Sequence, residues 1–202
     1  MVARSLERKA LSRPDVSFRF IKDGTEALHT PGDGKLSSAV YAALGREFAA
    51  SLLEISGSGG EIKVHGFVTK PLFGRGSRSM QIFFVNGRFI KSQLLTAALE
   101  EGYRNQIMKG KFPGCVLCVT VPVTAVDVNV HPAKTEVKFL SEKAVFDCVH
   151  YGILAALNKQ TDRPQVQFKT QAKEGSRLGP IPEGAVSKAD WGSVKKSNDT
   201  PS

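Results

Sequence analysis

The sequence predicts an α+β fold, in which a mixed sheet carries helices on one face as a two-layer sandwich. Three observations predict it. Apolar residues recur at helical spacing in four segments, shorter segments between them alternate apolar and polar residues, and turn dipeptides such as Asn86-Gly87 separate the alternating segments. With 202 residues and 41% hydrophobic content, the chain can bury one good-sized core and part of a second.

The N-terminal segment holds one helical and two strand-like stretches. A helix is expected over residues 3–12, and a hairpin over residues 16–22 and 25–28 that turns at Asp23-Gly24. Residues 1–30 are too few to form a domain. We therefore expect them to be either the trailing piece of a larger unit or an addition to the domain that follows.

Residues 31–158 supply the elements of the main domain. Helices are expected from residue 36, with a second helical piece through residues 48 and 52, and at 92–108 and 142–157, with Ser92 as an N-cap. Strands are expected at 61–70, 80–86, 115–121, 126–131 and 138–139. The Ser- and Gly-rich stretch 56–60 is expected to be a flexible turn. Residues 159–202 have few large apolar side chains and many Lys, Gln, Ser, Gly and Pro residues, so they are interpreted as a disordered linker or tail.

Basic residues cluster in one part of the chain. The net charge is +9 and the pI about 9.6, and the span 61–111 alone has nine basic and three acidic residues. Such clustering favours an anionic partner, whose phosphates the basic side chains would contact without reading bases. The candidate DNA-binding residues are Lys70, Arg75, Arg78, Arg88 and Lys91. Phe73 is a candidate for base stacking, and the alternative is a solvated basic edge that prevents sheets from pairing.

Two classes of protein and one kind of metal site are disfavoured. No apolar run reaches the roughly 20 residues that cross a bilayer, and the N-terminus lacks the apolar core of a secretory signal. Three cysteines cannot all pair, which suits a reducing compartment. Cys115 and Cys118 lie three apart in a strand-like run, so they should point to opposite faces, and two buried thiols are favoured over a zinc site.

The most informative stretch is Val126–Phe139, with the sequence VDVNVHPAKTEVKF. Its first six residues alternate as a strand that ends at Pro132, because proline cannot donate to the sheet ladder. Lys134 follows on a short loop, where it is well placed to meet a phosphate; an ion pair with Glu136 is the alternative. The residues expected to support this loop are Asp127, Asn129, His131 and Pro132.

Two strings, FFVNGR at Phe83–Arg88 and the Val126–Phe139 stretch, resemble signatures of the MutL family of DNA mismatch-repair proteins. The resemblance extends from about residue 3 to residue 158. It implies that residues 1–30 are the last elements of an N-terminal ATPase domain. Residues 31–158 would be the transducer domain that follows, with the ribosomal-protein-type βαβ fold of the superfamily that includes gyrase B.

The resemblance also implies the chemistry. The complete protein would bind ATP and Mg²⁺, dimerise, clamp DNA non-specifically and couple a MutS-type mismatch-recognition protein to later steps of repair. Lys134 would contact the ATP γ-phosphate in the adjacent ATPase domain. This chain lacks that domain's ATP motifs, so alone it is expected to be neither an enzyme nor a holder of cofactor or metal. The location would be bacterial cytoplasm, at the nucleoid, or a eukaryotic nucleus.

Two other readings of the residues remain open. A free-standing RNA- or ribosome-binding module of the same fold would use the same basic loop. A small-molecule kinase would need a glycine-rich loop leading into a helix, and the candidate Gly74–Ser77 leads into a predicted strand instead.

Overall fold

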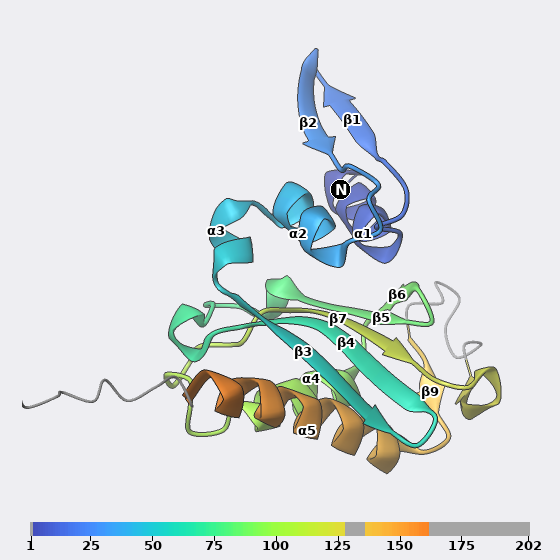
Figure 1. Ribbon diagram of the computed structural model, residues 1–202, viewed down its shortest axis with the longest axis vertical. Coiled ribbons are helices and arrows are strands. Elements are labelled where there is room, and N and C mark those ends of the chain that lie inside the picture. The colour runs from blue at the N-terminus through green and yellow to red at the C-terminus, as the bar shows by residue number, and fades with distance from the viewer. Residues whose placement is uncertain (1, 128–135, 162–202) are drawn as a thin grey trace, which may run out of the picture. The chain divides into compact units, whose positions relative to one another are not determined.

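The computed structural model describes residues 2–127 and 136–161 of the chain (Figure 1). Its centre is a five-stranded sheet with the strand order β3-β4-β7-β5-β6. These strands are β3 (Leu52–Gly59), β4 (Ile62–Thr69), β7 (Cys115–Thr120), β5 (Gln81–Val85) and β6 (Arg88–Ile90). The β5–β7 pair is parallel and the other pairs are antiparallel, so the predicted mixed sheet is confirmed.

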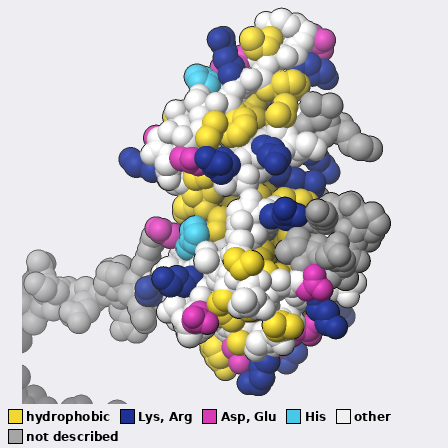
Figure 2. All heavy atoms as spheres, turned by 90° about the vertical axis from the view of Figure 1, so that its right-hand side faces the viewer, with side chains coloured by type: hydrophobic (Ala, Val, Ile, Leu, Met, Phe, Trp, Pro, Cys, Tyr) yellow, Lys and Arg dark blue, Asp and Glu magenta, His cyan; other side chains and the backbone are white. Residues whose placement is uncertain are grey.

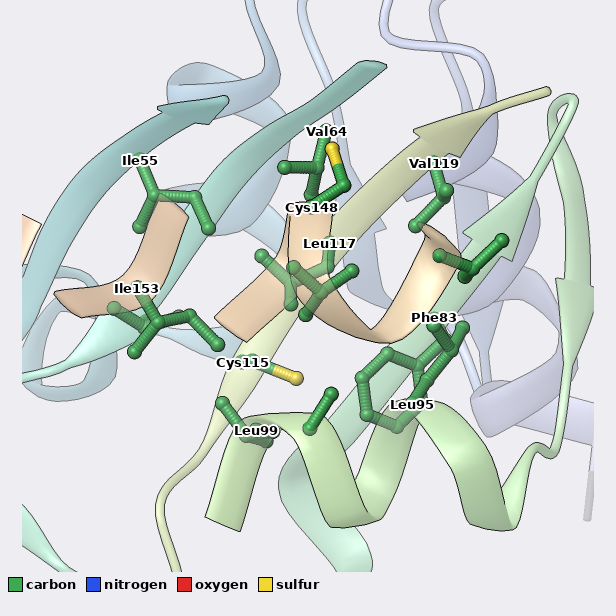
Figure 3. Packing of buried hydrophobic residues seen from close by; sticks show 14 of the residues in the cluster. Ile55, Val64, Phe83, Leu95, Leu99, Cys115, Leu117, Val119, Cys148 and Ile153 are labelled. Atoms are coloured by element: carbon green, nitrogen blue, oxygen red, sulfur yellow. The ribbon is translucent and has the colours of Figure 1, made fainter. Parts of the chain in front are cut away.

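One face of the sheet is covered by α4 (Gln93–Gly102) and α5 (Glu142–Thr161) (Figure 1). Alternate strand residues and one stripe of each helix form a single apolar cluster, in which Leu117, Leu95 and Ile153 are fully buried (Figure 3). The Ser92 hydroxyl accepts a hydrogen bond from the Leu95 amide at 3.3 Å, which confirms the predicted N-cap.

The opposite face of the sheet meets the N-terminal part of the chain. Leu11 of α1 (Val2–Ser12), Val40 of α2 (Leu36–Leu44) and Phe48 of α3 (Arg46–Ala50) share a second apolar cluster with residues of β5 and β7. The predicted hairpin is present as β1 (Arg19–Lys22) and β2 (Thr25–His29). The helix predicted from residue 36 and the second helical piece predicted after it are present as α2 and α3, which are separated by Gly45 with a φ of 86°.

Two strands were missed by the sequence patterns. Residues 56–60 are not a flexible turn, because residues 52–59 form the edge strand β3, paired along its whole length with β4. A Cβ at Gly57 would lie 3.2 Å from the Gly152 Cα of α5, so glycine lets the helix backbone approach the strand. Strand β6 follows the predicted Asn86-Gly87 turn.

Helix α4 ends at Gly102, six residues before the predicted end at residue 108. Tyr103 is fully buried, and its hydroxyl donates a hydrogen bond to the Thr69 carbonyl at the end of β4. Asn105 then adopts a φ of 63°, which no helix interior allows. The predicted end at residue 108 was wrong because apolar residues keep helical spacing up to that point. The helix itself ends earlier, where Tyr103 makes its contact with Thr69.

The remaining elements are short. Three 3₁₀ turns lie at Pro71–Phe73, Arg78–Met80 and Val123–Ala125, and a two-stranded ladder joins β8 (Val126–Asp127) to β9 (Lys138–Phe139). Among residues 2–127 and 136–161, no helix combines the length and apolar character needed to cross a bilayer.

Replacing Gly57 by valine should lower the free energy of unfolding by about 2 kcal/mol, because the added atoms meet backbone of α5 as well as Val64. Gly76→Val is the matched control, since a Cβ there meets nothing within 4 Å. Urea denaturation of both variants tests the contact. Equal stabilities would show that α5 does not need the bare backbone of Gly57.

Candidate nucleic-acid interface and phosphate loop

The register of the sheet separates the five candidate DNA-binding cations. Lys70 directly follows β4, and Arg75 and Arg78 lie in the connection from β4 to β5, so all three are at the end of the sheet where β7 begins. Arg88 starts β6 opposite Val85, the last residue of β5, and thus lies at the other end. Lys91 follows β6 on the sheet edge. The cations do not form one compact cluster.

Lys70 and Arg75 are held near α3. The Lys70 ammonium donates to the Ala50 carbonyl at 3.3 Å, and the Arg75 guanidinium lies over the Phe48 ring at 5.3 Å. Arg75 also exchanges two backbone hydrogen bonds of 2.8 Å with Phe112. Its Nε is buried and, among the described residues, has no hydrogen-bond partner. Among the described residues, neither Lys70 nor Arg75 forms an ion pair with a carboxylate. Both positive charges are therefore available to bind an anion.

Arg78 is already paired. Its guanidinium donates to both carboxylate oxygens of Glu100, at 2.6 and 3.0 Å, and lies over the Phe112 ring at 4.1 Å. Hydrogen bonding to this carboxylate raises the pKa of Arg78 and lowers that of Glu100. The arrangement fastens the β4–β5 connection to α4. Arg78 is therefore the weakest of the five candidates for a phosphate contact.

Arg88 and Lys91 are exposed on the edge strand and, within residues 2–127 and 136–161, have no carboxylate partner. Phe89 lies between them in the sequence, with its ring edge against Phe84 and the Arg8 guanidinium 3.9 Å from its centroid. Figure 2 shows the molecule from the side of the β5–β6 turn, where Lys and Arg side chains are spread over the face among hydrophobic ones. The positive surface on this side is diffuse.

Asn86 ties the β5–β6 turn to the end of β7. Its side-chain amide donates to the Val121 carbonyl and its side-chain oxygen accepts from the Val121 amide, both at 3.0 Å. The residue itself has a φ of 48°, which asparagine tolerates better than most residues. Sequence reasoning identified Asn86 as a turn residue only. The clamp was not visible in the pattern because its partner lies 35 positions away.

The predicted phosphate loop, residues 128–137 with Lys134, joins the two strands of the β8–β9 ladder. Asp127 lies opposite Lys138, so the two ends of the segment that carries Lys134 are held together. Lys134, Asn129, His131 and Pro132 lie outside the described residues. Asp127 and Glu136 are described and exposed. The roles of Lys134 and of the four loop-supporting residues therefore remain predictions.

The cysteines follow the predicted faces of β7. Cys115 belongs to the cluster under α4 and α5, whereas Cys118 packs against the cluster on the opposite face. Burial raises the pKa of both thiols, that of Cys118 to about 11. Among the described residues no three His, Cys, Asp or Glu side chains are grouped as metal ligands.

Comparison with known proteins identifies the family. A family model described as "DNA mismatch repair protein, C-terminal domain" matches residues 40–158. The chain belongs to this DNA mismatch-repair family. The predicted resemblance to MutL proteins is thereby confirmed.

Individual relatives agree with this assignment. The DNA mismatch repair protein MutL of Symbiobacterium thermophilum is 39% identical over 190 residues, which cover 89% of this chain and 30% of that protein. MutL of Agathobacter rectalis is 39% identical over 145 residues, or 72% of this chain and 22% of that protein. The chain thus spans less than a third of the length of these curated relatives.

A solved structure has a similar fold. The N-terminal domain of a DNA repair protein superposes with a TM-score of 0.63 at 22% identity, covering 77% of this chain and 52% of that one. The α+β fold class predicted from the sequence is confirmed.

Asn86→Ala should lower the free energy of unfolding by about 2 kcal/mol, because it removes two hydrogen bonds to Val121 and leaves a backbone amide and carbonyl unsatisfied. Asn105→Ala is the control, since Asn105 has a similar positive φ but is exposed and makes no such clamp. Thermal and urea unfolding measure both. A decrease no larger than that of Asn105→Ala would contradict the clamp.

Proposed function

We propose that the chain carries the transducer domain of a MutL-type mismatch-repair ATPase. In this proposal residues 1–30 are the last elements of the preceding ATPase domain, residues 31–158 are the transducer and residues 159–202 are a linker. The observation that carries it is the family match over residues 40–158, which includes both signature strings. The complete protein would bind ATP and Mg²⁺ in the ATPase domain, form a homodimer, and work with DNA and a MutS-type partner.

Lys134 is proposed to contact the γ-phosphate. An ammonium at this place would attract the terminal phosphate and lose its partner after hydrolysis, so it would bias the angle between two domains. The contacts on either side of the loop support this role for Lys134. The two hydrogen bonds between Asn86 and Val121 hold the end of β7, and the β8–β9 ladder holds both ends of the loop. Preorganised charge aimed at a reacting phosphate is a large contributor to catalysis.

DNA contact is proposed for the cations without carboxylate partners. Lys70, Arg75, Arg88 and Lys91 would contact backbone phosphates, and Arg78 would contribute less because Glu100 holds it. Contacts of this kind position a protein on DNA without selecting a sequence. The diffuse spread of basic side chains suits such non-specific binding.

In the full-length protein, Lys134→Ala should lower ATP turnover by roughly 10²-fold while leaving the unfolding midpoint unchanged. Lys138→Ala is the matched control, because Lys138 is an exposed lysine of the same ladder. Steady-state phosphate release measures both variants. Turnover of Lys134→Ala equal to that of Lys138→Ala would remove the sensor role.

The double variant Arg88→Gln/Lys91→Gln should make the log–log dependence of duplex-DNA affinity on salt shallower by about 0.9 for each phosphate that is no longer neutralised. Arg78→Gln should change the slope less, and Lys22→Gln, on the exposed hairpin, serves as a control. Fluorescence anisotropy over a range of salt gives the slopes. An unchanged slope in the double variant would contradict DNA contact at β6. Much tighter binding of structured RNA than of duplex DNA at the same salt concentration would favour an RNA-binding module.

A further inference from the structure

The end of the sheet where β7 begins carries an exposed apolar surface that the proposed function does not use. Leu72 is 93% exposed and Phe73 46% exposed on the β4–β5 connection, and Met108 is 75% exposed on the α4–β7 connection. We call these three residues the apolar corner. Large apolar side chains that are exposed on two joined connections are a feature of interaction sites.

The two connections are fastened to each other, so the corner is preformed. Arg75 and Phe112 exchange two backbone hydrogen bonds across them. Next to this bridge Gly74 has no side chain, and a Cβ there would lie 2.8 Å from the Ile107 Cδ1 and 2.9 Å from the Lys111 Cβ. Leu72 and Phe73 on one side and Met108 on the other flank this contact. Binding of a partner would therefore cost little conformational entropy in these two connections.

Positive charge surrounds the apolar corner. The segments 70–80 and 104–112 contain six basic residues and no Asp or Glu. Glu100 pairs with Arg78 and Glu101 pairs with Arg104. In the described part of the chain, the other four have no carboxylate partner: Lys70, Arg75, Lys109 and Lys111.

From the apolar corner and its rim we infer a docking site for an acidic segment of another protein, one that carries large apolar side chains between Asp and Glu residues. Leucine and methionine side chains exposed to this degree offer nothing to a phosphate backbone, whereas Met, Phe and Arg are enriched at protein interfaces. Lys109 and Lys111, which the proposed DNA contact does not use, would pair with the carboxylates and guide the encounter.

This chain does not supply the matching charge. Residues 162–202 contain seven Lys or Arg and five Asp or Glu residues, and the whole chain has a net charge of +9, so neither this tail nor a second copy is complementary. The inference does not rest on Lys134 or on DNA contact at β6. It adds a protein-binding surface at the end of the sheet where β7 begins.

The test uses the whole chain and a fluorescein-labelled peptide of repeated Glu-Glu-Leu-Phe units, with polyglutamate of the same length as comparator. The peptide should bind about tenfold more tightly than polyglutamate. The double variant Leu72→Ser/Met108→Ser should weaken peptide binding by a similar factor, and Lys109→Glu/Lys111→Glu should weaken it and reduce its salt dependence. Val123→Ser changes an exposed apolar residue outside the corner and should leave peptide binding unchanged.

The same variants are measured against single-stranded and duplex DNA. Unchanged DNA affinity of Leu72→Ser/Met108→Ser supports the inference. A decrease in DNA affinity as large as the decrease in peptide affinity would assign the corner to nucleic acid and overturn it. Equal binding of the peptide and polyglutamate, or peptide binding that the serine variant leaves intact, would also overturn it. Circular dichroism melting checks that the variants fold, which is expected because all five substituted positions are exposed.

Discussion

The fold depends on the burial of β7 from both sides. Five of its six residues belong to the two apolar clusters: Cys115, Leu117 and Val119 to the cluster under α4 and α5, Val116 and Cys118 to the one shared with α1, α2 and α3. The strand also pairs antiparallel with β4 and parallel with β5. Parallel pairing usually requires such double coverage. Each fully buried side chain contributes about 1.5–3 kcal/mol, so the loss of either layer would expose the centre of the sheet.

Different candidate functional residues lie near the two ends of β7. Its beginning lies beside the connections that carry Lys70, Arg75, Arg78 and the apolar corner, and its end leads through Val121 to the ladder that bounds the phosphate loop. A strand of six residues spans roughly 20 Å, which is beyond the distance over which salt leaves exposed charges coupled. Basic residues that follow one another in the sequence, such as Arg78 and Arg88, thus lie toward different ends of the sheet.

The sequence patterns predicted the elements that depend on neighbouring residues. They missed the features that depend on contacts with residues far away in the sequence. Alternation and turn dipeptides located β4, β5 and β7, and the hydroxyl of Ser92 located the start of α4. The Ser- and Gly-rich strand β3 was read as a turn, because the helix that requires its small residues lies about 95 positions later at Gly152. Similarly, the charge count treated Arg78 as a free cation, since only the folded chain brings Glu100 to its side. The phosphate loop was predicted from its alternation and proline, and Lys134 lies outside the described residues.

The contact between α1 and the sheet edge connects the N-terminal segment to the proposed DNA surface. Phe89 lies between Arg88 and Lys91 in sequence, and its ring is held by Arg8 of α1 on one side and by Phe84 of β5 on another. Packed aromatic side chains shift between discrete arrangements rather than deform gradually. A displacement of α1 would therefore remove the Arg8 contact and require the Phe89 ring to repack beside Arg88.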